Sequence, residues 1–111
     1  MSHEFLDYVE DILDAMGKAE LLLKDITYEE LVADFRINFA VFRALEIVGE
    51  ATKRLPNSVR EQYPDIPWKE MAGMRDRIIH NYDRVDYRIV WETVKKRIIR
   101  SRIPAISFQG M

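Results

Sequence analysis

Cysteine is absent from this chain of 111 residues, and glycine and proline are scarce, with four of each. Without cysteine the chain has no disulfide framework, no thiolate metal ligand and no cysteine nucleophile. A reducing cytoplasm is therefore the simplest compartment to expect. Scarce glycine and proline disfavour barrels and sandwiches, which need many tight turns. The length indicates a single domain over residues 1–111, with one modest hydrophobic core.

Long apolar runs and an excess of positive charge are missing as well. No apolar run approaches the roughly 20 residues of a membrane-spanning helix. The N-terminus also lacks the basic and then apolar pattern of a signal peptide, so we expect no membrane association. The net charge of −2 disfavours a broadly basic nucleic-acid-binding protein. Any contact with RNA must then depend on a local basic patch.

What the sequence contains in abundance is helical periodicity. Apolar residues recur at alternating spacings of four and three over residues 4–24, which predicts an amphipathic helix. Thr27 and Glu30 have the spacing of a capping box, which predicts a second helix that begins there and runs to about Leu55. Gly49 lowers the helix propensity of this segment, so we expect it to permit close approach by a neighbouring backbone.

Three further helical segments are predicted downstream. A short helical turn spans residues 57–62, and a third long helix begins near Pro67 and ends at about residues 81–83. Asp86 is the predicted cap of the last helix, which has an apolar face and a basic face. No strand alternation is visible. The predicted fold is an all-α, up-and-down bundle of four main helices plus one short helical turn.

The second predicted helix carries more apolar surface than a small domain needs. Part of this surface is therefore expected to face a second subunit, in a homodimer. Its apolar positions are Leu31, Phe35, Phe39, Phe42 and Leu45 on one side, and Val41, Ala44 and Val48 on an adjoining side.

The densest group of reactive side chains lies in residues 74–82, where Arg75, His80 and Tyr82 form an Arg-x4-His-x-Tyr pattern. His80 can serve as an acid or a base near neutral pH. Arg75 can bind phosphate oxygens and offset the charge of a pentacoordinate phosphorus. Asp76 lies four residues before His80, where a helix would let it orient the imidazole. These groups are the parts of a metal-independent ribonuclease.

Helix geometry restricts how these groups can meet. On an ideal helix Arg75 and His80 point about 140° apart, whereas Arg75 and Tyr82 nearly eclipse. Arg75 and His80 can share one cleft only through long side-chain reach, a distorted helix end or a neighbouring chain. One interior histidine also has to serve two proton transfers, so the cleft hypothesis depends on two copies of the motif in a symmetric dimer.

Simpler interpretations exist for each of these residues. A histidine near a helix end is usually a cap or a core residue, and Arg75 beside Asp76 can be an ordinary surface pair. Trp68 and Trp91 are more typical of a core than of base stacking. Glu46 and Glu50 fit exposed helix charges, and the basic face of the last helix fits a solvated face. His80 with Asp76 is too sparse for a metal site, so we expect no metal and no cofactor.

The motif resembles the signature of the HEPN superfamily, in particular its HepT-like branch of small bacterial and archaeal toxins. The resemblance extends to the opening helix around residues 8–13, to residues 44–51 with their Gly-Glu-Ala step, to the connector at 63–68 and to 90–91. One departure is Asp76, where many relatives have Asn. A carboxylate at this position raises the basicity of His80 and repels RNA phosphate.

This resemblance implies a homodimer whose cleft is lined by Arg75 and His80 of both chains, with Asn81 and Glu50 as candidate supporting residues. It implies a toxin that cleaves RNA and is neutralised by a nucleotidyltransferase antitoxin. In related pairs the antitoxin adds AMP to the motif tyrosine, here Tyr82. Two alternatives stay open. In the first, the chain is a non-enzymatic partner and substrate of the nucleotidyltransferase. In the second, it is a structural dimer with no active cleft.

Overall fold

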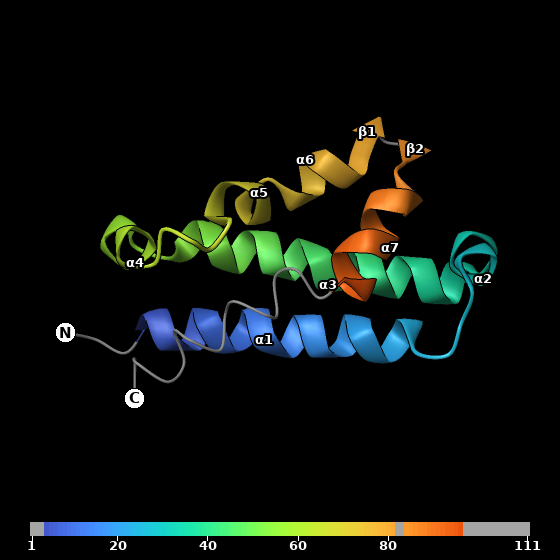
Figure 1. The fold of residues 1–111 in the computed structure, drawn as a ribbon, viewed down its shortest axis with the longest axis horizontal. Coiled ribbons are helices and arrows are strands. Elements are labelled where there is room, and N and C mark those ends of the chain that lie inside the picture. The colour runs from blue at the N-terminus through green and yellow to red at the C-terminus, as the bar shows by residue number, and fades with distance from the viewer. Residues whose placement is uncertain (1–3, 82–83, 97–111) are drawn as a thin grey trace.

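Two long antiparallel helices form the base of the fold in the computed structural model, which describes residues 4–81 and 84–96 (Figure 1). They are α1 (Glu4–Leu23) and α3 (Phe35–Arg54), and α2 (Tyr28–Ala33) connects them. A second layer covers α3 and then returns to α1. It consists of α4 (Asn57–Gln62), α5 (Trp68–Ala72), α6 (Met74–Ile78), β1 (Ile79–Asn81), β2 (Arg84–Val85) and α7 (Tyr87–Lys95).

The predicted all-α class is confirmed, with one small antiparallel pair of strands as the exception. The first helix, the short helix at residues 57–62 and the cap at Asp86 lie where the sequence predicts them. The capping box also forms, because Thr27 N donates to Glu30 Oε1 at 3.0 Å and Glu30 N donates to Thr27 Oγ1 at 3.1 Å. Among the helices of the described residues, none combines the length and apolar character needed to cross a bilayer.

The prediction of one continuous helix from Thr27 to Leu55 is wrong, because Asp34 divides it. Asp34 has an extended backbone (φ −100°, ψ 104°), and its N–H donates to the Glu30 carbonyl at 2.9 Å to close α2. Its carboxylate then accepts from Arg36 N at 2.9 Å and caps α3. A short acidic side chain competes in this way with continuation of the helix.

A buried amide stabilises this break. Asn38 is 3 % exposed, and its Nδ2 donates to the carbonyls of Leu31 at 3.0 Å and Val32 at 3.3 Å. These carbonyls belong to the last turn of α2, where no following helical N–H is available to them. The end of α2 is therefore bonded to the first turns of α3.

The prediction of a third long helix reaching residues 81–83 is also wrong. The segment forms two five-residue helices, α5 and α6, with Gly73 between them, and α6 ends at Ile78. Glycine weakens helix continuation at the first break. At the second, β-branched Ile78 and Ile79 favour an extended chain. Asp86 N donates to the Ile78 carbonyl at 2.7 Å, and Ile79 pairs with Val85 in the two-stranded sheet.

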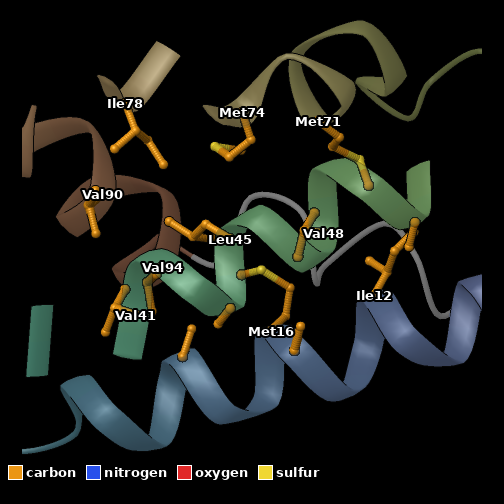
Figure 2. Packing of buried hydrophobic residues seen from close by; sticks show 14 of the residues in the cluster. Ile12, Met16, Val41, Leu45, Val48, Met71, Met74, Ile78, Val90 and Val94 are labelled. Carbon is orange, nitrogen blue, oxygen red and sulfur yellow. The ribbon is translucent and has the colours of Figure 1, made fainter. Parts of the chain in front are cut away.

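The core lies on both sides of α3, between α3 and α1 and between α3 and the second layer (Figure 2). Methionines of α5 and α6 point down onto α3, and residues of α1 reach up to α3 from below. Trp68 is buried as predicted and donates from Nε1 to the Tyr63 carbonyl at 3.0 Å. Trp91 is half-buried, and its ring and that of Tyr28 meet edge to face. The labelled core residues are Ile12, Met16, Val41, Leu45, Val48, Met71, Met74, Ile78, Val90 and Val94.

The Asp34 cap predicts a pH dependence of stability. Arg36 donates from its side chain to both Asp34 oxygens, at 3.2 and 3.1 Å, and lowers the pKa of Asp34 below its ordinary value of 3.8. Because the folded-state pKa is the lower one, the stabilisation is present above pH 3.8 and is lost as the pH falls through the folded-state value. Asp34→Asn keeps a capping oxygen but does not titrate.

We therefore expect Asp34→Asn to lower the Tm near neutral pH, where the wild type has the charged carboxylate. This difference should shrink as the pH falls below 3.8 and through the lowered pKa of the folded state. Thermal unfolding followed by circular dichroism across this range measures it. Parallel Tm curves for the two proteins at all pH values contradict the assignment.

Candidate functional site

The candidate site begins where the second layer lies closest to α3. A Cβ added to Gly49 of α3 lies 3.3 Å from the carbonyl oxygen of Met71, 3.5 Å from that of Ala72 and 3.9 Å from Met74 Cβ. The predicted role of Gly49 in close backbone approach is therefore confirmed. This contact places the first residues of α6 beside the turn of α3 that precedes Gly49.

Arg75, the second residue of α6, reaches Glu46 in that turn of α3. Arg75 Nε lies 3.7 Å from Glu46 Oε2, and the two side chains are 67 % and 36 % exposed. An ion pair with this exposure contributes only about 0–1 kcal/mol to stability, because water and salt screen it. The guanidinium is thus located by α3 but stays accessible to an incoming anion.

His80 lies in β1, beyond the end of α6, so Arg75 and His80 belong to different elements (Figure 1). Of the three ways in which they could share a cleft, a distorted helix end is the one that the backbone shows. The angle of 140° expected for a continuous helix no longer applies. Asp76 is exposed on α6, and the helical spacing from which it was expected to orient His80 is interrupted at Ile78. The catalytic roles of Asp76 and His80 stay predictions.

The remaining candidates are only partly placed by the structure. Asn81 is in β1 and its backbone pairs with Arg84. The side chains of His80 and Asn81, and the whole of Tyr82, lie outside what the structure describes. Glu50 is exposed, and its Oε1 lies 3.8 Å from Lys53 Nζ. Its support of the cleft stays a prediction.

Among the described side chains, Glu46 and not Glu50 is the α3 carboxylate that contacts Arg75. The sequence interpretation treated Glu46 only as an exposed charge. The signal that could have identified Glu46 is its position one turn before Gly49. A glycine at which two backbones meet places the side chains of the adjacent turn next to the neighbouring element. Glu50 instead lines a hollow of about 250 Å³ on the α1 side of α3, together with Tyr8, Asp11, Arg43 and Arg54.

The predicted basic face of the last helix is engaged within the chain as far as it is described. Lys95 Nζ donates to the Leu23 carbonyl at 2.6 Å and so satisfies the C-terminal end of α1. Lys96 Nζ lies 3.9 Å from Glu92 Oε2. Arg97, Arg100 and Arg102 lie outside the described residues. Of these two residues, Lys95 therefore makes a structural contact with α1, whereas Lys96 forms an exposed ion pair and fits the simpler interpretation of a solvated helix face.

Metal-ligating side chains do not gather in the part of the chain that the structure describes. Among the side chains that the structure describes, which do not include that of His80, no group of three or more His, Cys, Asp or Glu is arranged to hold a metal ion. A hollow of about 730 Å³ lies between α1 and α7, and its described lining includes Leu13, Leu21 and Val94. None of its described lining residues belongs to the motif.

Comparison with known proteins settles the family. The profile described as "Ribonuclease HepT-like" matches residues 12–106. The chain belongs to the HepT-like ribonuclease family. The range includes the α3 turn with Glu46 and Gly49, as well as the motif from Arg75 to Tyr82. The resemblance drawn from the motif is thereby confirmed.

Several archaeal and bacterial relatives are similar over most of their length. "Probable ribonuclease HepT" of Thermococcus cleftensis is 47 % identical over 98 residues, which are 88 % of this chain and 89 % of the relative. "Putative RNase MJ0125" of Methanocaldococcus jannaschii is 47 % identical over 96 residues, or 86 % and 77 % of the two chains. "Putative RNase TTE0752" of Caldanaerobacter subterraneus is 47 % identical over 91 residues, or 82 % and 81 %. No solved structure matches the chain.

The contact at Gly49 predicts a cost for any larger residue there. Gly49→Val places branched methyl groups against the Met71 and Ala72 carbonyls, so we expect a loss of about 1–3 kcal/mol in the free energy of unfolding. Urea denaturation followed by tryptophan fluorescence measures this loss. Arg43→Val, at an exposed position of the same helix, is the control and should change stability by less than about 1 kcal/mol. Equal stability of the two variants contradicts a tight interface.

Proposed function

We propose that this chain is a metal-independent RNA endonuclease that acts as the toxin of a toxin–antitoxin pair. The observation that carries the proposal is Arg75. It lies exposed at the start of α6, five residues before His80 in β1, in a chain of the HepT-like ribonuclease family. An accessible guanidinium can bind a phosphodiester, and an imidazole that shares its cleft can transfer protons to and from it.

The proposed reaction needs two proton transfers and no metal. His80 removes the proton of a ribose 2′-OH, and the oxygen attacks the adjacent phosphorus. The bond from phosphorus to the 5′ oxygen breaks, and that oxygen takes a proton from His80 of a second copy. The products are a 2′,3′-cyclic phosphate and a 5′-hydroxyl end. Arg75 stabilises the charge on the equatorial oxygens of the pentacoordinate phosphorus, and Asp76 raises the basicity of His80.

The second imidazole requires a homodimer, and α3 offers a surface for it. Phe35 and Phe39 are 65 % and 68 % exposed, and their rings contact edge to face with centroids 5.9 Å apart. Exposed aromatic pairs of this kind mark interaction surfaces. Phe39 and Glu46 are seven residues apart, so they share one face of α3. Burial of this face between two copies brings both Arg75 side chains towards the interface.

The proposed partner besides RNA is a nucleotidyltransferase antitoxin that adds AMP to Tyr82. The support for it is the family resemblance of the motif. An added phosphate near Arg75 would compete for the guanidinium and repel RNA. The alternative is that the chain has no nuclease activity and serves only as the partner and substrate of this enzyme.

The proposed catalytic roles are tested with purified protein and a single-stranded RNA in the presence of EDTA. We expect the wild type to cleave, and His80→Ala to lower the rate by at least about 100-fold because the general base is lost. Arg75→Ala should lower the rate by about 100–1,000-fold because the phosphorane charge is uncompensated. Asp14→Ala, which breaks an exposed ion pair with Lys18 on α1, is the control and should cleave as the wild type does.

Equal cleavage by all four proteins would indicate a contaminating nuclease and refute the proposed activity. A different outcome distinguishes the alternative. If no protein cleaves RNA, but incubation with a nucleotidyltransferase and ATP adds one AMP to the wild type and none to Tyr82→Phe, the chain is a substrate module.

The dimer surface is tested by introducing charged residues at its apolar positions. Replacing both Phe35 and Phe39 by Asp should convert a dimer into a monomer in light scattering, because two carboxylates cannot be buried there without partners. The same variant should lose RNA cleavage. Leu21→Asp, at a 71 % exposed apolar position of α1, is the matched control and should stay dimeric. A monomeric wild type, or a doubly substituted variant that stays dimeric, contradicts this surface.

A further inference from the structure

The ion pair between Glu46 and Arg75 involves one particular edge of the guanidinium. Glu46 Oε2 lies 3.7 Å from Nε, the nitrogen nearest the side-chain stem. The guanidinium is planar and presents its N–H donors in fixed directions. A carboxylate on the Nε side therefore favours orientations of the plane in which Nε faces α3. The opposite edge, formed by the two terminal nitrogens, is then left free to take a phosphate with two parallel hydrogen bonds.

Glu46 is the anchored member of this pair. It belongs to the middle of α3, where the neighbouring residues Leu45 and Val48 are buried in the core, and its side chain is 36 % exposed against 67 % for Arg75. The first residue of α6, Met74, is 2 % exposed and lies against Gly49. The backbones at both ends of the pair are thus held by core packing. This packing does not determine the orientation of the long Arg75 side chain.

We propose that Glu46 is a positioning residue for Arg75, and this inference rests on the ribonuclease function proposed above. By pairing with Nε, the carboxylate holds the guanidinium with its terminal nitrogens directed away from α3, ready for a phosphodiester. A carboxylate so close to the anion site also repels RNA. Loss of Glu46 should therefore slow the chemical step, because the guanidinium is no longer oriented. It should not weaken the binding of RNA, because a repelling charge is removed.

Kinetics with three variants separate positioning from charge. Glu46→Ala removes both the carboxylate and its orienting oxygen, so kcat should fall by about tenfold while KM stays equal or falls. Glu46→Gln removes the charge but keeps an oxygen that can face Nε, so kcat should stay within about threefold of the wild type. Asp14→Ala removes a carboxylate from another exposed ion pair and should match the wild type in both constants.

Two kinetic outcomes overturn the inference. If Glu46→Ala has the wild-type kcat while His80→Ala is inactive, Glu46 does not position the guanidinium. If Glu46→Ala and Glu46→Gln lower KM equally and leave kcat unchanged, the carboxylate acts only through its charge. Unfolding curves of all variants are recorded alongside, so that a loss of folded protein is not mistaken for a loss of activity.

A measurement that does not require activity distinguishes failure of this inference from failure of the proposed function. The Arg75 Nε–H resonance is assigned by its absence from Arg75→Lys, in protein labelled with ¹⁵N. In Glu46→Ala this resonance should shift and exchange faster with water, whereas in Asp14→Ala it should not change. If no protein cleaves RNA, this spectrum alone decides whether Glu46 orients Arg75. An unchanged resonance in Glu46→Ala overturns the inference whatever the nuclease assay shows.

Discussion

The close contact between α3 and the second layer at Gly49 is the constraint on which the candidate site depends. The Met71 carbonyl lies 3.3 Å from where a side chain of Gly49 would begin, so the two backbones are separated by little more than van der Waals distance. Met71 and Met74 can then bury their side chains against α3, where they are 0 % and 2 % exposed. The same packing brings Arg75 into reach of Glu46. The same contact between backbones therefore builds the core and positions Arg75 beside Glu46.

The helix breaks at Asp34 and Ile78 have local causes, and each break shapes the surface next to it. At Asp34 a side-chain cap ends α2 and begins α3, and buried Asn38 satisfies the carbonyls that the break exposes. The division leaves Phe35 and Phe39 exposed at the start of α3. At Ile78 the chain leaves the helix and enters a short strand, which separates His80 from the helix that carries Arg75. Both breaks lie next to surfaces that the proposed function requires.

The electrostatics of the site are local, because the chain as a whole carries a net charge of −2. Arg75 stands beside Glu46 of α3 and is followed in the chain by Asp76. An anion that binds here must compete with carboxylates, and the long-range field of the protein does not attract it. Specific geometry, and not general positive charge, then has to provide binding.

The sequence by itself determined the helical class, the capping box at Thr27, the cap at Asp86, the close approach at Gly49 and the family motif. Each of these depends on neighbouring residues or on a spacing within one helix. It did not reveal the short helices α5 and α6, because the apolar positions of residues 68–79 also fit one continuous helix. Nor did it reveal the strand at His80, since pairing with residues 84–85 is a contact between segments and not a property of either one. Only the tertiary structure decided that Glu46 and not Glu50 reaches Arg75, because two carboxylates one turn apart differ by how a neighbouring element packs against them.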